Sequence, residues 1–561
     1  MPGAILNAYL KSATPIRSWP APAISFRNGA LLFVCCVLFH IAGTWRLPLI
    51  DRDEPRFAEA SREMIERGDY VVPYFNNHVR FDKPPLTYWA QTASYQIFGE
   101  TDFAARFPSV IAAALTALVI FAWGSRMRPA GGAPALQPQS GANIGFSAAL
   151  IFTLCLQTFV HAKAAVADMW LVLFVTTGHW AGWEMLFGEV TRKRSTFNPP
   201  TQGFGVAGVQ PASAMDGLRR GERSMLNESR EAPDSMWWWI FYISLALAFL
   251  AKGPIGFISL LTVGLFAIVA RPPDLLRRFG FARGLTLTIV LVAAWAVPAC
   301  IQTSGEFLRV GIGRHVIGRS IGAMEGHGAS SLLVYALLLP FYFVTVFLSF
   351  FPWSIKLPWL TRKVWQQWDA LDQYLVCGVA VTFAIFTLVA TKLPHYTLPA
   401  FPLLALLLAR HWSRSESTSA GRPADVDRDW FRTIAMVITC LWLAAALIVP
   451  PLVARFFPAY TLFQQASHDL RPAMEFGAVE YNEPSLVWYF RSRVKGFMTP
   501  LNKNSAVEFM REPGARFVIV PNELLNTIAT NRSQNWKLIS THGFNLAKGR
   551  SEDLTLALKP E

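Results

Sequence analysis

Apolar runs long enough to cross a membrane recur through most of this chain, and they limit its fold more than any other feature. They begin near residue 30 and end near residue 454. A helix of about 20 apolar residues spans the hydrocarbon core of a bilayer, and irregular backbone cannot face lipid because its hydrogen bonds would be unmade. We therefore predict a polytopic α-helical membrane protein with about 11 to 13 transmembrane helices.

The basic residues indicate how these helices cross the membrane. They lie mainly beside the apolar runs, so the formal net charge of +14 does not point to a nucleic-acid partner. A cytoplasmic N-terminus puts most basic connections inside, as the positive-inside rule requires. The expected spans are 29–45, 106–124, 143–161, 166–186, 236–250, 254–270, 284–301, 331–351, 373–391, 394–410 and 432–454.

The sequence predicts two domains. Residues 1–454 form the transmembrane domain, with a first extracytoplasmic loop at 46–105. An odd number of spans leaves residues 455–561 outside, as a small extracytoplasmic α/β domain. Its expected strands are Phe476 to Tyr481, Phe517 to Pro521, Lys537 to Ser540 and Leu554 to Leu558.

The first loop contains a short amphipathic segment that begins beside Asp53. Apolar residues at Phe57, Ala60 and Met64 share one helical face, and Gly68 marks the end. The pattern predicts a helix that lies along the membrane surface.

Asp53 itself allows two interpretations, which the local sequence favours about equally. Aspartate is a preferred N-cap residue, and Pro55 suits a first helical turn. Alternatively, Asp53 takes part in chemistry. A carboxylate at a helix N-terminus stays charged and is a weak base, yet it can orient an acceptor or stabilise positive charge on a reacting sugar.

Three blocks in this loop carry a resemblance to a known family. The blocks DEPRFAEASREM, DKPPLTYW and FGETDFAARFPS follow one another in order. Together they resemble the first periplasmic loop of bacterial lipid A 4-amino-4-deoxy-L-arabinose transferases, which are related to protein O-mannosyltransferases and share the GT-C membrane fold. The resemblance implies that Asp53 is catalytic and that Glu54 and Arg56 belong to the same motif.

The family also implies an activity and a location. We expect transfer of a sugar, such as aminoarabinose or a related pentose or hexose, from a polyprenyl-phosphate donor to lipid A or another envelope glycan. The reaction would take place at the periplasmic face of a bacterial inner membrane. The expected partners are the lipid-linked donor, the envelope acceptor and membrane lipids, with no nucleic acid.

Ionisable residues at the predicted outer ends of spans are the next candidates for the functional site. A charged side chain within the membrane has a high free energy unless it is paired. The simpler interpretation is that the lysines extend to lipid headgroups. Their position on one side of the membrane favours a shared role in binding the donor phosphate. The candidate donor-binding residues, with the two from the motif, are Glu54, Arg56, Lys83, Asp168, Lys252, Arg319, Lys392, His395 and Tyr396.

A divalent metal ion is the one cofactor that the sequence suggests. Family members usually have Glu before the Lys-Pro pair, where this chain has Asp82. In relatives, the loop that corresponds to 302–330 carries an Arg and a His near the donor. Arg319 matches the Arg, and either His315 or His327 matches the His. The predicted ligands are therefore Asp82 with His315 or His327.

Three alternatives stay open at this point. A transporter of envelope lipid or sugar also has many spans with charged residues, although its binding groups favour the bilayer midplane. A non-catalytic envelope scaffold would use Asp53 only as a cap. The third alternative keeps the chemistry and changes the acceptor to a different glycan or to protein.

Overall fold

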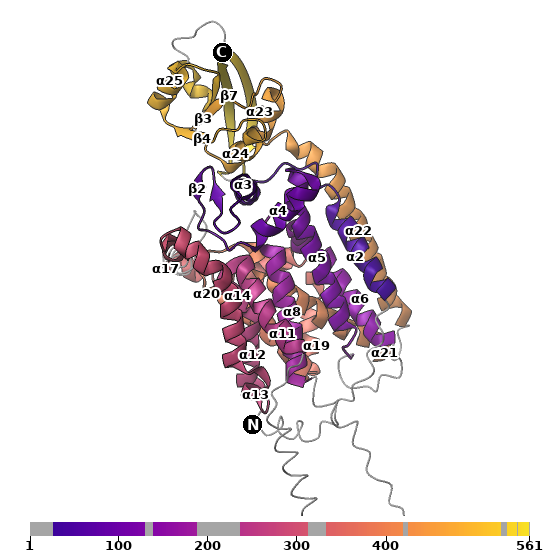
Figure 1. The fold of residues 1–561 in the computed structure, drawn as a ribbon. Coiled ribbons are helices and arrows are strands. Elements are labelled where there is room, and N and C mark those ends of the chain that lie inside the picture. The colour runs from indigo at the N-terminus through magenta and orange to yellow at the C-terminus, as the bar shows by residue number, and fades with distance from the viewer. Residues whose placement is uncertain are drawn as a thin grey trace, which may run out of the picture.

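The computed structural model describes residues 26–128, 139–187, 236–311, 313, 332–418, 424–528, 536–546 and 548–559. It consists of a long helical body and a smaller domain that contains the C-terminal sheet (Figure 1). The first loop lies between these two parts, so it contacts both.

Helices occur at every predicted span. Two of the spans are interrupted, one at Cys155 and one just before Phe341. The helices of the body are α2 (Phe26–Ile41), α5 (Asp102–Gly124), α6 (Gln139–Leu154), α7 (Leu156–His161), α8 (Asp168–Phe187), α11 (Met236–Lys252), η1 (Gly253–Phe257), α12 (Ile258–Ala270), α13 (Leu275–Phe279), α14 (Phe281–Gln302), α15 (Glu306–Leu308), α17 (Leu332–Leu337), α18 (Phe341–Ser349), η3 (Trp353–Lys356), α19 (Leu357–Gln366), α20 (Ala370–Leu388), η4 (Pro394–Ala400), α21 (Phe401–Thr418) and α22 (Ala424–Ala454).

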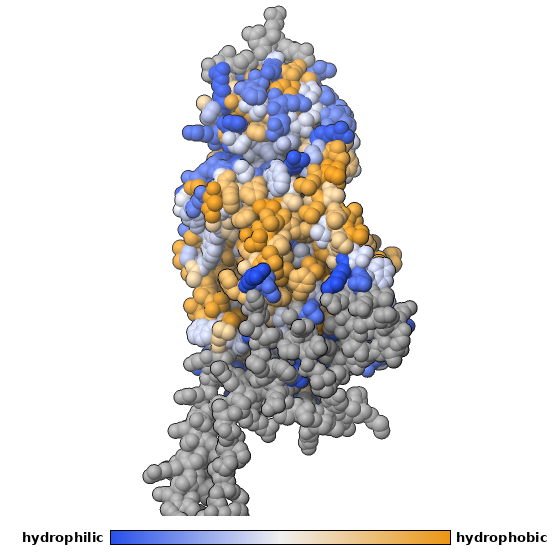
Figure 2. All heavy atoms as spheres, turned by 90° about the vertical axis from the view of Figure 1, so that its right-hand side faces the viewer, coloured by the Kyte–Doolittle hydropathy of each residue, from blue (hydrophilic) through white to orange (hydrophobic). Residues whose placement is uncertain are grey.

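The body has the composition of a multi-pass membrane protein. Among the described residues, five helical segments are long and apolar enough to cross a membrane, and two shorter apolar helices accompany them. Figure 2 shows a broad hydrophobic surface on the body below a hydrophilic C-terminal domain. The polytopic helical fold is confirmed, while the number of spans stays a prediction.

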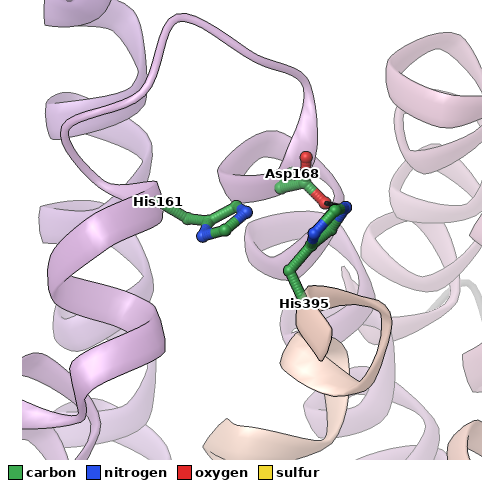
Figure 3. A group of neighbouring side chains, drawn as sticks. All are labelled: His161, Asp168 and His395. Carbon is green, nitrogen blue, oxygen red and sulfur yellow. Dashed lines mark ion pairs between the residues drawn. The ribbon is translucent and has the colours of Figure 1, made fainter. Parts of the chain in front are cut away.

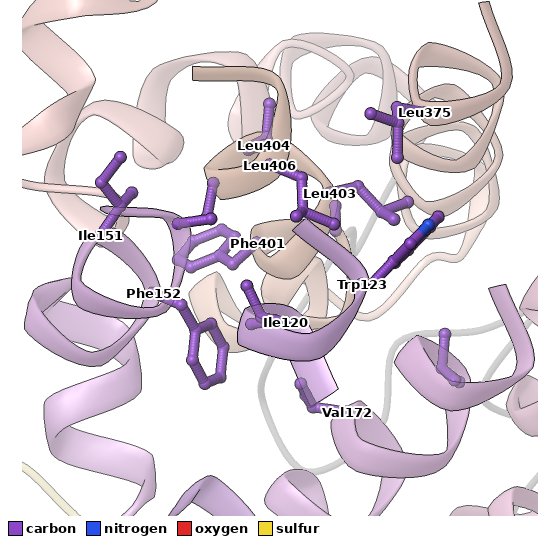
Figure 4. Packing of buried hydrophobic residues seen from close by; sticks show 14 of the residues in the cluster. Ile120, Trp123, Ile151, Phe152, Val172, Leu375, Phe401, Leu403, Leu404 and Leu406 are labelled. Carbon is purple, nitrogen blue, oxygen red and sulfur yellow. The ribbon is translucent and has the colours of Figure 1, made fainter. Parts of the chain in front are cut away.

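Small residues allow the central helices to pack closely. A Cβ on Gly124 of α5 would lie 2.7 Å from the Cα of Gly145 on α6, so only glycine fits this crossing. Bulky side chains fill the space around it, among them Trp123, Phe152 and Phe401 (Figure 4). This core holds the helix ends that carry the charged candidate residues.

The first loop folds into α3 (Asp53–Arg67), a two-stranded hairpin of β1 (Tyr74–Phe75) and β2 (His78–Val79), and α4 (Leu86–Phe98). The predicted helix after Asp53 is confirmed. It ends where predicted, because Gly68 adopts φ 64°, a left-handed conformation that glycine tolerates without strain.

The C-terminal domain is a mixed five-stranded sheet with helices. Its elements are α23 (Pro458–Ala466), β3 (Glu475–Val479), α24 (Pro484–Arg491), β4 (Met498–Leu501), α25 (Lys503–Arg511), β5 (Arg516–Pro521), α26 (Asn522–Ile528), β6 (Lys537–Asn545) and β7 (Arg550–Lys559). The strand order is β4-β3-β5-β7-β6, with β3 parallel to both neighbours and β7 antiparallel to both of its own. The four predicted strands are present, and β4 was missed because MTPL is short and contains a proline.

The C-terminal domain covers part of the polar face of α3, and the position of this helix along the membrane surface stays a prediction. Glu59, Arg62 and Glu63 are at most 1% exposed, because the C-terminal domain covers that face. Arg491 of α24 forms ion pairs with Glu59 and, at 2.7 Å, with Glu66. Glu59, Arg62 and Glu63 therefore contact protein and not water, whereas Glu66 near the end of α3 is exposed.

Candidate functional site

Asp53 is the first residue of α3 and not its cap. The N-cap position is Arg52, whose side chain makes no capping hydrogen bond. Asp53 is exposed, whereas Glu54 and Pro55 beside it are buried. The capping interpretation is therefore wrong, and an exposed carboxylate is held at the start of a helix whose residues from Phe57 to Met64 are buried.

Glu54 fixes this end of the helix. Its Oε2 accepts hydrogen bonds from Arg106 Nη2 at 2.7 Å and from the Ile50 amide at 2.8 Å. Its Oε1 accepts from Arg106 Nε at 2.9 Å and from the Ala165 amide at 2.7 Å. Each oxygen has two protein partners, so the geometry favours a positioning role for Glu54 over the substrate contact predicted from the motif.

A second group of polar side chains follows the hairpin. Arg80 donates from Nε to the Tyr88 hydroxyl at 2.8 Å and pairs through Nη2 with Asp82 Oδ2 at 3.1 Å. Lys83 Nζ pairs with Asp82 Oδ1 at 2.9 Å. Burial raises the pKa of Tyr88 to about 12, so Tyr88 remains a neutral hydroxyl. Asp53 is close enough for its charge to act on Arg80 and Tyr88.

The ends of the membrane helices contribute a third group. Lys252, the last residue of α11, donates from Nζ to Asp168 Oδ1 at 2.6 Å, and Asp168 is the first residue of α8. His395 Nε2 of η4 lies 3.9 Å from the same Oδ1. The ring of His161, from the end of α7, faces the His395 ring with 4.7 Å between the two ring centroids (Figure 3). The centroid of the Tyr396 ring lies 5.4 Å from Lys252 Nζ.

These groups lie close enough to form one site. Asp53 interacts electrostatically with Lys252, and Lys83 interacts electrostatically with His395. The structure thus brings Asp53 and Lys83 of the loop toward Asp168, Lys252 and His395 of the membrane helices. Two lysines accompany an exposed carboxylate, a combination that can bind an anion beside a reacting centre.

Lys392 has a different environment from the one predicted. Its ammonium donates to the carbonyls of Phe386 at 3.0 Å, Thr387 at 2.5 Å and Val389 at 2.7 Å, which end α20. Lys163 binds the carbonyls that end α2 in the same way. A cation at a helix C-terminus satisfies carbonyls that lack helical partners. Lys392 therefore serves the fold in this structure.

Arg56 lies one helical turn after Asp53 on α3, and the other remaining predicted residues lie outside the described part of the chain. The charge of Arg56 acts on Asp51, whose carboxylate accepts hydrogen bonds from Ser485 in the C-terminal domain. Arg319, His315 and His327 lie outside the described residues.

Two sets of residues could be considered for a metal ion. His161, Asp168 and His395 bring their ligand atoms within 4.8 Å of one another, and two imidazoles with a carboxylate suit Zn²⁺. However, the Lys252 ammonium already occupies Asp168 Oδ1, and a cation would have to displace it. Asp82, the predicted ligand, is likewise paired with Arg80 and Lys83.

Arg80, Tyr88 and His161 were not predicted. Arg80 and Tyr88 flank the DKPP block in sequence, but nothing in a single sequence shows that their side chains would meet. His161 ends the helix before the Asp168 turn, and an ionisable residue at that end of an apolar run was the available signal.

Comparison with solved structures defines the class of protein. ArnT from Cupriavidus metallidurans, in a structure bound to undecaprenyl phosphate, superposes with a TM-score of 0.68 at 17% identity, over 95% of this chain and 98% of that chain. The apo structure of the same protein superposes with a TM-score of 0.66 at 18% identity, again over 95% of this chain and 98% of that chain. The chain therefore has the GT-C membrane fold with a small C-terminal sheet domain.

Sequence comparison gives particular relatives. The chain is 28% identical over 377 residues to the undecaprenyl phosphate-α-4-amino-4-deoxy-L-arabinose arabinosyl transferase of Aeromonas hydrophila, covering 66% of this chain and 58% of that protein. The enzyme of the same name from Pectobacterium atrosepticum is 26% identical over 383 residues, which cover 68% of this chain and 57% of that protein. The matches span less than three fifths of the length of these relatives. No family model matches. The predicted resemblance to aminoarabinose transferases is confirmed.

Proposed function

We propose that this protein is a glycosyltransferase that moves a sugar from a polyprenyl-phosphate donor to an envelope acceptor. The sugar is aminoarabinose or a related pentose or hexose, and the acceptor is lipid A or another envelope glycan. The reaction takes place at the periplasmic face of the bacterial inner membrane, with the N-terminus in the cytoplasm and the C-terminal domain in the periplasm. The names of the sequence relatives and the positions of the basic residues support this proposal.

One observation carries the proposal. Asp53 is exposed at the end of α3, while its charge and that of Lys83 reach the Lys252, Asp168 and His395 group at the helix ends. An acceptor-orienting carboxylate thus stands beside two ammonium groups. A phosphate leaving group needs cations and little acid catalysis, because a phosphate leaves readily once its charge is stabilised.

The mechanism follows from these positions. The donor phosphate binds Lys83 and Lys252, and its sugar projects toward Asp53. An acceptor oxygen attacks the anomeric carbon while the bond from that carbon to the phosphate oxygen breaks, and the electron pair leaves with polyprenyl phosphate. Asp53 orients the acceptor and takes its proton as the new bond forms. A single displacement of this kind inverts the anomeric configuration.

Substitution of Asp53 tests the proposal. Asp53→Asn changes one oxygen to nitrogen at an exposed position, so the fold should persist while transfer falls by about 10²-fold or more. The measurement is mass spectrometry of envelope lipids from cells that carry either form. Loss of the modified lipid with accumulation of the polyprenyl-phosphate sugar is expected. Full modification by Asp53→Asn, or uptake of an unaltered sugar lipid into vesicles, would contradict the proposal.

The divalent cation predicted from the sequence is kept as a proposal, with Asp82 as a ligand. A metal ion there would replace the Lys83 ammonium on Asp82 Oδ1. Metal analysis of purified protein and of Asp82→Asn tests this. Equimolar metal that is lost in the variant supports the site, and equal content in both proteins contradicts it.

A further inference from the structure

A cavity of about 190 Å³ lies between the first loop and the C-terminal domain. Arg62 of α3 and the turn at Glu100 to Asp102 form one side, and α23 with α24 forms the other. A water needs only ~10–15 Å³ of a volume measured in this way, so the cavity has room for several waters or for a single monosaccharide ring.

The cavity is separate from the proposed reaction site. Arg62 follows Asp53 by nine residues, which is about two and a half turns at 3.6 residues per turn. The two side chains therefore leave α3 on opposite faces. A ligand in the cavity would contact the C-terminal domain and not the reacting atoms.

Arg62 holds Glu100 in place at the edge of the cavity. Arg62 is 1% exposed and binds Glu100 through Nε at 2.7 Å and Glu59 through Nη1 at 2.7 Å. Its Nη2 is buried and has no hydrogen-bond partner among the described residues. This nitrogen has almost no accessible surface, so a ligand in the cavity would contact Glu100 and not Arg62 Nη2.

The charge of the lining selects the kind of ligand. Glu100 and Asp102 outnumber the single guanidinium of Arg62, so a phosphate or other anion would be repelled. Asp102 is occupied by Trp488 Nε1 at 2.7 Å and the Tyr489 hydroxyl at 3.0 Å. Glu100 is 39% exposed and bonds Arg62 through Oε2 alone, which leaves Oε1 to accept from a hydroxyl or an ammonium group.

The opposite wall is aromatic. Tyr460 and Phe463 of α23 are partly buried and pack around Tyr489 at 5.3 and 5.9 Å between ring centroids. Aromatic rings offer a flat apolar surface, while Gln464 at the exposed edge provides an amide with both donors and an acceptor. Apolar ring faces with hydroxyls at the edge are a property of sugars.

We infer that this cavity binds one neutral or amino sugar unit of a glycan, through Glu100, Gln464 and the aromatic wall. The identity of that glycan as the transfer acceptor rests on the proposed function, and the binding itself does not. The C-terminal domain thereby holds a sugar that does not react and positions the acceptor relative to Asp53.

Gln464 and Gln465 provide a matched pair of variants. Both are exposed on α23, and only Gln464 lines the cavity. Gln464→Trp should fill the cavity without disturbing the core, and Gln465→Trp should leave it open. The probes are methyl β-D-glucosaminide and methyl β-D-glucoside, with inorganic phosphate for comparison, added to full-length protein in detergent and followed by saturation-transfer NMR.

We expect binding of at least one methyl glycoside and none of phosphate. Affinity should fall about tenfold or more in Gln464→Trp and stay unchanged in Gln465→Trp. No glycoside binding, phosphate binding, or equal affinity in both variants would overturn the inference. Asp53→Asn should still bind the glycoside although it does not transfer, so failure of the sugar site and failure of the proposed function give different results.

Discussion

Lys252 donates a hydrogen bond of 2.6 Å to Asp168 Oδ1, and this ion pair joins the end of α11 to the start of α8. Both side chains are largely buried, at 16% and 10% exposure. Asp168 thus holds the lysine that we assign to the donor phosphate. Removal of one member of such a pair leaves the other charge poorly solvated, which typically costs about 3–5 kcal/mol.

Asp168→Asn should therefore lower thermal stability and reduce transfer together. The double variant Asp168→Asn with Lys252→Gln should recover much of the stability because neither charge is then unpaired. It should not recover transfer, since a cation for the phosphate is missing. Thermal unfolding in detergent and a transfer assay distinguish the two effects, and full activity of the double variant would contradict the role of Lys252.

Glu54 should stabilise the fold through its buried ion pair with Arg106. Glu54→Gln breaks a buried ion pair with Arg106, so we expect a loss of about 3–5 kcal/mol in unfolding free energy. Glu66→Gln on the same helix is the control, since Glu66 is 41% exposed and should cost about 1 kcal/mol or less. Equal stability of the two variants would contradict the anchoring role.

Local patterns predicted much of the fold and of the site. Apolar runs gave the helices of the body, because a helix in lipid must satisfy its own backbone and be apolar along its length. Gly68 marked the end of α3, since φ 64° requires a residue without a Cβ penalty. Asp168, Lys252 and His395 were found because charge at the end of a span needs a partner.

Long-range contacts could not be predicted in the same way. A sequence shows that Arg62 and Glu59 share a face of α3, but not that Arg491, more than 400 positions later, covers it. The buried ion-pair network on this face could therefore not be predicted from the sequence. The carbonyl partners of Lys392 on α20 could not be predicted for a similar reason, because sequence patterns do not reveal contacts with backbone groups.

Lys392 is expected to affect stability and not donor affinity. Lys392→Met removes a cation that binds three carbonyls at the end of α20, which should cost about 1 kcal/mol. The KM for the polyprenyl-phosphate sugar should stay within about twofold, a change of less than half a kcal/mol. A donor KM raised about tenfold with unchanged thermal stability would instead place Lys392 on the phosphate.

Contact between the first loop and the C-terminal domain should weaken as the pH rises. Burial raises the pKa of Asp51 to about 7 although Ser485 hydrogen bonds oppose the shift, and burial raises the pKa of Glu59 to about 7 against Arg62 and Arg491. Between their ordinary values of 3.8 and 4.5 and about pH 7, the folded protein holds protons that the unfolded chain releases. Stability therefore falls with rising pH across this window, and the destabilisation is complete above it.

Hydrogen exchange of the α24 amides at pH 5.5 and 8, corrected for intrinsic rates, measures this effect directly. Protection should be greater at the lower pH. Asp51→Asn cannot ionise and keeps an oxygen that accepts from the Ser485 amide, so its protection should change less with pH than that of the wild type. Protection that increases from pH 5.5 to 8, or an Asp51→Asn variant with the full wild-type dependence, would show that these buried acids are charged throughout and that the interface does not respond to their protonation.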